Sequence, residues 1–164
     1  MSNLLYNFWN ITRKGVIASL LAMAVSITFV GAASANPFKK VAGKWRSAGA
    51  TAVIKGNKER IKCRASYNVP GRTVKLNLKC SGPGYFINVY VDGRVIGSKV
   101  KGSWRETQFG KSGWLSGRAS SKSSNISFSG GGFKGGLSVR FSSSKRHAIY
   151  IRANGNRVSI PLRR

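Results

Sequence analysis

The chain has 164 residues, of which 29 are lysine or arginine and only three are acidic, so its net charge is +26. Hydrophobic residues make up 41% of it, which is enough for one domain with a packed core. Three carboxylates and one histidine are too few for most acid–base, paired-carboxylate or metal-assisted mechanisms. We therefore expect a binding protein and not an enzyme, with no metal and no cofactor.

The first 35 residues have the layout of a secretory signal peptide. The basic pair Arg13-Lys14 precedes an apolar run of about 15 residues, which is shorter than the roughly 20 that a membrane-spanning helix needs. The small-x-small motif Ala33-Ser34-Ala35 then predicts cleavage before Asn36. We expect residues 36–164 to be exported to the periplasm or the extracellular space as one domain. The leader holds two basic residues and no acidic one, so this domain keeps 27 basic and three acidic side chains, a net charge of +24.

Alternation of apolar and polar residues predicts strands at 60–67 and 74–80, joined by a turn at 69–72. Cys63 and Cys80 both fall on the apolar face of these neighbouring strands. They are the only cysteines of the chain, and disulfides persist in exported proteins. The pattern therefore predicts a Cys63–Cys80 disulfide across a hairpin.

The same alternation continues to the end of the chain, with turn signals about every ten residues. The expected strands are 85–91, 94–105, 113–121, 125–129, 137–142, 145–153 and 158–162. Asp92-Gly93 and Asn154-Gly155-Asn156 are the expected hairpin turns, and the glycine-rich segment 130–136 is interpreted as a corner. About 8–10 short strands predict an all-β fold, a small antiparallel up-and-down barrel. An open β-sandwich is the alternative.

Aromatic residues and the lone histidine have both structural and functional interpretations. We expect most of the large aromatics to pack in the core or at a barrel end, not to form stacking platforms for bases or sugars. This group is Trp45, Trp104, Trp114, Phe86, Tyr90 and Phe141. The tyrosines Tyr67, Tyr85 and Tyr150 are expected at the rim or surface. His147 follows Lys145 and Arg146, so we expect it at the surface and not in a catalytic triad.

Basic residues are spread along the strands and not gathered in a tail. The cations expected to share outward faces are Arg60, Lys62, Arg64, Lys75, Lys79, Lys99, Lys101, Arg140, Arg146, Arg152 and Arg157. This excess is larger than solubility requires, although solubility is the alternative explanation. The pattern favours non-specific binding of anionic polymers or headgroups, such as lipopolysaccharide, phospholipid, acidic polysaccharide or nucleic acid. Two further hypotheses are a secreted effector or protease inhibitor that acts on a host or competitor protein, and a carrier of a small apolar ligand. The oligomeric state is not indicated.

Gly43-Lys44-Trp45 resembles the glycine-x-tryptophan element of lipocalin-type barrels. In that group the tryptophan closes one barrel end and the interior commonly holds a small apolar ligand. The chain lacks a lipocalin-like threonine-aspartate-tyrosine element. Small exported protease-inhibitor barrels of Gram-negative bacteria also pair an early glycine-x-tryptophan with one disulfide, and the chain is similar to them to the same extent.

A broader resemblance covers residues 43–164. The succession GKWR, ERIKCRASY, VKLNLKC, GSWRE and GWLSGRAS is similar to small exported proteins of rhizobia-related bacteria. This resemblance implies an exported β-domain from an alphaproteobacterium. It brings no assigned chemistry, so no functional residue is carried over from it.

Overall fold

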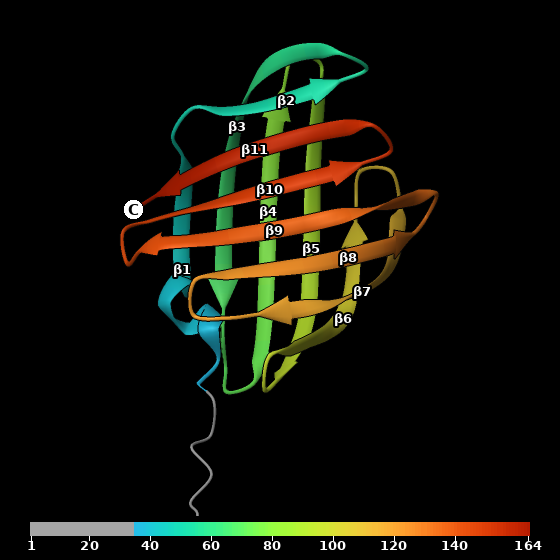
Figure 1. The fold of residues 1–164 in the computed structure, drawn as a ribbon. Helices are drawn as coiled ribbons and strands as arrows, with labels where there is room; N and C mark the ends of the chain where they lie inside the picture. The colour runs from blue at the N-terminus through green and yellow to red at the C-terminus, as the bar shows by residue number, and fades with distance from the viewer. Residues whose placement is uncertain (1–34) are drawn as a thin grey trace, which may run out of the picture. The chain divides into compact units, whose positions relative to one another are not determined.

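The computed structural model describes residues 35–164, and residues 1–34 of the predicted leader lie outside the described part. One short 3₁₀ helix, η1, and eleven antiparallel strands form an up-and-down barrel (Figure 1). The elements of the first half are η1 (Pro37–Val41), β1 (Gly43–Ser47), β2 (Ala50–Ile54), β3 (Asn57–Asn68), β4 (Thr73–Gly82) and β5 (Tyr85–Ile96). Those of the second half are β6 (Lys99–Glu106), β7 (Lys111–Ala119), β8 (Ser123–Gly130), β9 (Phe133–Ser143), β10 (Arg146–Ala153) and β11 (Asn156–Arg163).

The sheet closes because β1 and β2 together fill one place between β11 and β3. Both strands pair with β3 on one side and with β11 on the other. The chain bulges between them at Gly49, whose φ of 77° favours glycine, and the Ser47 hydroxyl accepts a hydrogen bond from the Cys63 N–H across the bulge (2.8 Å). Eleven strands therefore occupy ten positions around a closed barrel, and the predicted barrel is confirmed over the open sandwich.

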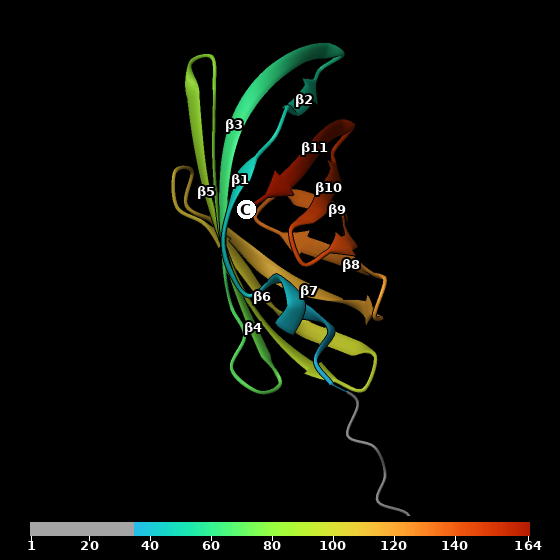
Figure 2. The ribbon, with the colours of Figure 1, turned by 90° about the vertical axis from the view of Figure 1, so that its left-hand side faces the viewer.

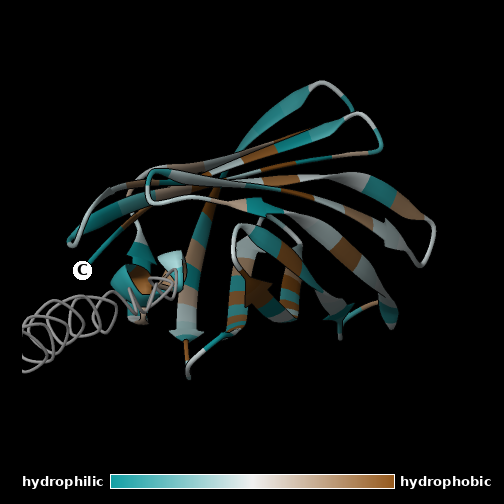
Figure 3. Cartoon of the chain, turned by 60° about the horizontal axis from the view of Figure 1, so that its bottom comes forward, coloured by the Kyte–Doolittle hydropathy of each residue, from teal (hydrophilic) through white to brown (hydrophobic). Residues whose placement is uncertain are grey.

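Alternating side chains point into and out of the barrel, as a strand period of two requires. Along β3, for example, every second residue from Ile61 to Tyr67 is buried and the residues between are exposed. Figure 3 shows the resulting mixture of hydrophobic and hydrophilic positions along the strands. In Figures 1 and 2, β3–β5 lie on one side of the barrel and β8–β11 cross them on the other. The apolar faces of the two sides meet in the interior.

The hairpin between β3 and β4 confirms the predicted disulfide. Cys63 and Cys80 are direct partners in the strand register, and their sulfur atoms are bonded. The predicted turns at 69–72 and at Asn154-Gly155 are also present. Asn154 and Gly155 both have positive φ, 49° and 79°, which a two-residue hairpin turn of this kind requires.

The expected turn at Asp92-Gly93 is wrong. Strand β5 continues through both residues to Ile96, and the chain turns only after it. The reason lies in the neighbouring strands, because Gly93 pairs with Val74 on one side and with Gly102 on the other. A side chain at Gly102 would come within 2.1 Å of the Asp92 carbonyl oxygen. Glycine at these positions therefore allows β5 and β6 to approach each other closely.

We predict that replacing both cysteines by alanine lowers the free energy of unfolding by about 3 kcal/mol, because the disulfide restricts the unfolded chain. The bond joins residues 17 positions apart within one hairpin, so the barrel itself should survive. Urea unfolding followed by tryptophan fluorescence would measure the loss. A change below about 1 kcal/mol would contradict a stabilising role for this bond.

Candidate functional site: an apolar cavity and a basic outer wall

The barrel encloses a cavity of about 300 Å³. Its walls come from strands all around the barrel, and they are made mainly of Val, Leu, Ile and Phe side chains. At one end the cavity reaches Phe38 and Tyr67, and at the other it reaches Phe109 and Phe133. A barrel of ten strand positions is wider than the smallest barrels, whose own side chains fill the interior, so space is left inside.

The first end of the barrel is closed by η1 and Trp45. The Asn36 side chain accepts a hydrogen bond from the Phe38 N–H (3.1 Å) and donates to the Gly71 and Thr73 carbonyls (3.1 and 3.2 Å), which ties η1 to the turn between β3 and β4. Trp45 is fully buried and its Nε1 donates to the Val41 carbonyl at 2.7 Å. We call this the closed end.

The Arg164 guanidinium covers the closed end from outside. It lies 4.3 Å from the centre of the Trp45 ring and donates to the Ala42 carbonyl. A cation over an indole face is attracted by the ring quadrupole. Arg164 thus holds β1 in place. This one of the many cations therefore has a structural role.

His147 is buried at the closed end, so its expected surface position is wrong. Its side chain is only 2% exposed, its Nε2 lies 3.2 Å from the Tyr67 hydroxyl, and its ring packs edge-on against Trp45 (4.3 Å between centroids). Burial, together with the positive charge of Arg164, lowers the pKa of His147 to about 4. Burial also raises the pKa of Tyr67, which was expected at the rim. His147 and Tyr67 are therefore both neutral, and they pack as part of the closed end.

The opposite end, which we call the mouth, carries the turns β2–β3, β4–β5, β6–β7, β8–β9 and β10–β11. The turn β6–β7 is held by the Glu106 carboxylate, which accepts hydrogen bonds from the N–H groups of Asn88 (3.2 Å), Gln108 (2.8 Å) and Phe109 (2.7 Å). Burial alone would raise the pKa of Glu106, but these hydrogen bonds outweigh it and the pKa is lowered. The charged carboxylate fixes the backbone at the mouth.

On the outer wall, strand register aligns five cations that are direct neighbours on five adjacent strands. In strand order from β4 to β10 they are Lys79, Arg64, Arg46, Arg163 and Arg146. All five side chains are exposed, and we call this row the cation belt. The acidic residues lie elsewhere: Asp92 pairs with Lys75, Glu106 is bound at the mouth, and one Glu59 oxygen is buried. Like charges in register repel, by a few tenths of a kcal/mol for each adjacent pair.

The belt contains three of the predicted anion-binding residues, Arg64, Lys79 and Arg146. The sequence missed Arg46 and Arg163, because their proximity depends on closure of the barrel. Arg152 lies opposite Arg157, and Lys101 lies opposite Arg94, as two separate pairs. Lys99 lies opposite Arg118 as a third such pair. The register places the other predicted cations beside polar or apolar partners: Arg60 at Thr51, Lys62 at Ser81, and Arg140 at Ala148 and Ser123.

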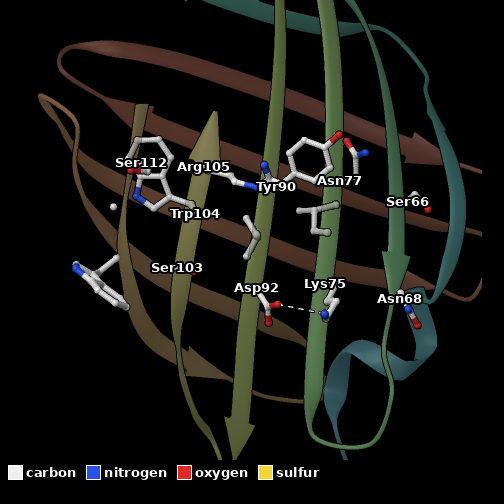
Figure 4. Close-up of a pocket in the computed structure, with 14 residues that line it drawn as sticks. Ser66, Asn68, Lys75, Asn77, Tyr90, Asp92, Ser103, Trp104, Arg105 and Ser112 are labelled. Carbon is white, nitrogen blue, oxygen red and sulfur yellow. Dashed lines mark ion pairs between the residues drawn. The ribbon is translucent and has the colours of Figure 1, made fainter. Parts of the chain in front are cut away.

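Lys75 differs from the belt because its charge is paired. Its Nζ lies 3.3 Å from the Asp92 carboxylate in a groove on the outer wall, shown in Figure 4. Tyr90 lies between Arg105 and Asn77 in the same view, with the Arg105 guanidinium 4.4 Å from the Tyr90 ring centre. An exposed ion pair of this kind adds little stability but removes Lys75 as a free cation.

Three of the aromatics that were expected in the core lie outside. Trp114 is 75% exposed on the wall, Phe86 is 43% exposed near the mouth, and Tyr90 lies in the groove of the outer wall, because all three stand at outward positions of their strands. Trp45 and Phe141 are buried as predicted, and Trp104 packs edge-on against Phe128 inside the barrel (5.9 Å). Tyr150 is exposed, also as predicted.

Comparison with known proteins gives no further assignment. The chain matches no protein-family model, and no curated protein matches it. Within residues 35–164, no helix is both long enough and apolar enough to cross a membrane. The same residues contain no group of three His, Cys, Asp or Glu side chains placed to hold a metal ion.

Burial of His147 predicts a pH-dependent stability. The folded-state pKa of about 4 lies below the ordinary value of 6.5, so the unfolded chain binds more protons between these two values. Stability should therefore fall as the pH drops from 6.5 to 4, by roughly 2 kcal/mol after allowance for solvent screening. His147→Gln, measured by urea unfolding at each pH, should lose this dependence. Equal pH profiles for the two proteins would contradict the prediction.

Proposed function

We propose that this protein binds a small apolar ligand inside the barrel. The observation that carries the proposal is the apolar cavity of about 300 Å³, which is closed by Trp45 and η1 at one end and reaches exposed residues at the other. Its volume lies at the lower limit of roughly 300–1,000 Å³ for small-molecule sites. An empty cavity of this size costs stability, since protein interiors are otherwise close-packed. A bound ligand would recover that cost.

The polar groups of the cavity indicate how such a ligand is oriented. The charged and amide side chains of its lining, Glu106, Lys111 and Asn156, all belong to the mouth. Deeper in, Trp104 has a buried Nε1 without an acceptor among the described residues. A buried N–H normally has a partner. We infer a ligand that is mostly apolar, has its polar end at the mouth and carries one hydrogen-bond acceptor.

A second function, binding of polyanions on the outer wall, is favoured by the cation belt. Five exposed cations in direct register repel one another, and no acidic side chain is aligned with them. A polyanion laid along the belt would relieve this repulsion and release counterions, so its affinity should fall steeply with salt. The belt holds no element that reads bases, so binding of nucleic acid would be independent of sequence.

Filling the cavity should abolish binding of an apolar ligand. Leu137→Trp and Val89→Trp each place a large side chain in the lumen, and we expect at least about a tenfold weaker binding of the neutral fluorescent probe N-phenyl-1-naphthylamine. The matched control is Ser138→Trp, the outward neighbour of Leu137. Its affinity should be unchanged. A probe that binds all four proteins equally would exclude the lumen as the site.

Neutralising the belt should weaken binding to heparin and stabilise the fold. We expect the triple variant Arg46→Gln, Arg64→Gln, Arg163→Gln to bind heparin about 10- to 100-fold more weakly at 0.15 M salt and to gain about 1 kcal/mol in stability. A control with the same net charge replaces three dispersed cations, Lys58, Arg118 and Lys122, by Gln. Equal salt elution of the two variants from heparin would show that only total charge matters, against a role for the belt.

A further inference from the structure

Large apolar side chains are exposed around the mouth. Six large hydrophobic residues are exposed among the described residues, and three of them, Phe86, Phe109 and Phe133, lie beside turns of the mouth. Phe109 is 62% exposed and Phe133 is 39% exposed, and both also line the cavity. Exposed apolar groups at the opening of an apolar cavity indicate an interaction surface.

These phenylalanines are held in place by the structure around them. Glu106 accepts a hydrogen bond from the N–H of Phe109 itself, and Phe133 packs edge-on against Trp104 (6.3 Å). The turns that carry them are in contact, because a side chain added at Gly131 would come within 3.0 Å of the Lys111 Cβ. The two rings therefore project from one continuous, ordered rim.

Cations flank the exposed rings. Lys111 follows Phe109 by two residues, and Lys134 follows Phe133 directly. Lys55 on the β2–β3 turn and Lys58 at the start of β3 add two more charges, and all four lysines are exposed. Of the two acidic residues at this end, Glu106 is committed to backbone N–H groups and Glu59 has one oxygen buried. The mouth thus combines apolar tips with a positive rim.

We propose that the mouth docks on an anionic lipid bilayer. Phenylalanine rings favour the boundary between headgroups and acyl chains, and lysines beside them favour anionic headgroups. A protein partner would need a matching apolar pocket, whereas a bilayer accepts rings at any spacing. If the barrel carries an apolar ligand, as proposed above, docking in this orientation lets the ligand pass from bilayer to cavity between Phe109 and Phe133 without crossing water.

Orientation on vesicles tests this proposal. Because both native cysteines form the disulfide, Phe109→Cys and Ile96→Cys each add one free thiol, which is labelled with an environment-sensitive fluorophore. Ile96 is the matched control, since it is 56% exposed but stands at the opposite end of the barrel. On vesicles of phosphatidylglycerol and phosphatidylcholine, the label at 109 should shift to the blue and the label at 96 should not. Bound protein with no shift at 109, or with equal shifts at both positions, would overturn the proposal.

A second pair of variants separates apolar insertion from attraction by the basic wall. Phe109→Ser with Phe133→Ser should lower vesicle binding at 0.5 M salt by at least about tenfold, because salt screens the charges and leaves the rings. Trp114→Ser, which removes the most exposed ring of the wall, should have no effect. An unchanged affinity of the Phe variant would also overturn the proposal. Binding of N-phenyl-1-naphthylamine without vesicles reports the cavity by itself, so a failure of docking is distinguishable from a failure of ligand binding.

Discussion

The pairing of the first strands with the last one is the constraint on which the other features depend. Strand β11 pairs with β1 and β2, and this contact turns an extended meander into a closed barrel. An open sheet would leave two unpaired edges and expose one apolar face. Closure buries that face, and the ten strand positions leave an interior that the side chains do not fill. The closed end then needs its own cover, which η1, Trp45 and Arg164 provide.

The same closure creates the electrostatic pattern of the wall. Arg46 and Arg163 lie near opposite ends of the described chain, and only barrel closure makes them register partners. Their repulsion opposes the pairing that closes the sheet, so the hydrophobic interior and the backbone ladder must outweigh it. The barrel nevertheless closes at this β1–β11 seam, where Arg46 and Arg163 are direct partners. The seam and the mouth are different parts of the molecule, which allows the two proposed activities to be altered separately.

Local patterns predicted much of the fold, because strands and hairpins depend on neighbouring residues. The Cys63–Cys80 pair, the turn at 69–72 and the turn at Asn154-Gly155 all follow from alternation and turn chemistry. The turn expected at Asp92-Gly93 did not form, since pairing along the whole of β4 and the close approach of Gly93 to Gly102 outweigh the local preference.

The candidate sites were less predictable than the fold. His147 was assigned to the surface from its basic neighbours, although its parity with Ile149 and Ile151 already indicated an inward position. Trp114 likewise has the opposite parity to the buried Leu115. The belt partners Arg46 and Arg163 carry no local signal, because register across the closing seam is a property of the whole barrel. The cavity volume depends on the strand number and on every inward side chain together, so it also could not be derived from any one segment.

The central claim is that the barrel interior is a ligand site. Methyl NMR of residues 36–164, titrated with a neutral apolar molecule, tests it most directly. The account predicts saturable shifts at one equivalent, confined to inward methyl groups such as those of Val91, Leu137 and Ile151, with those of the outward Ile96 unchanged. Shifts on the outer wall alone, or none with any member of a panel of apolar molecules, would contradict it.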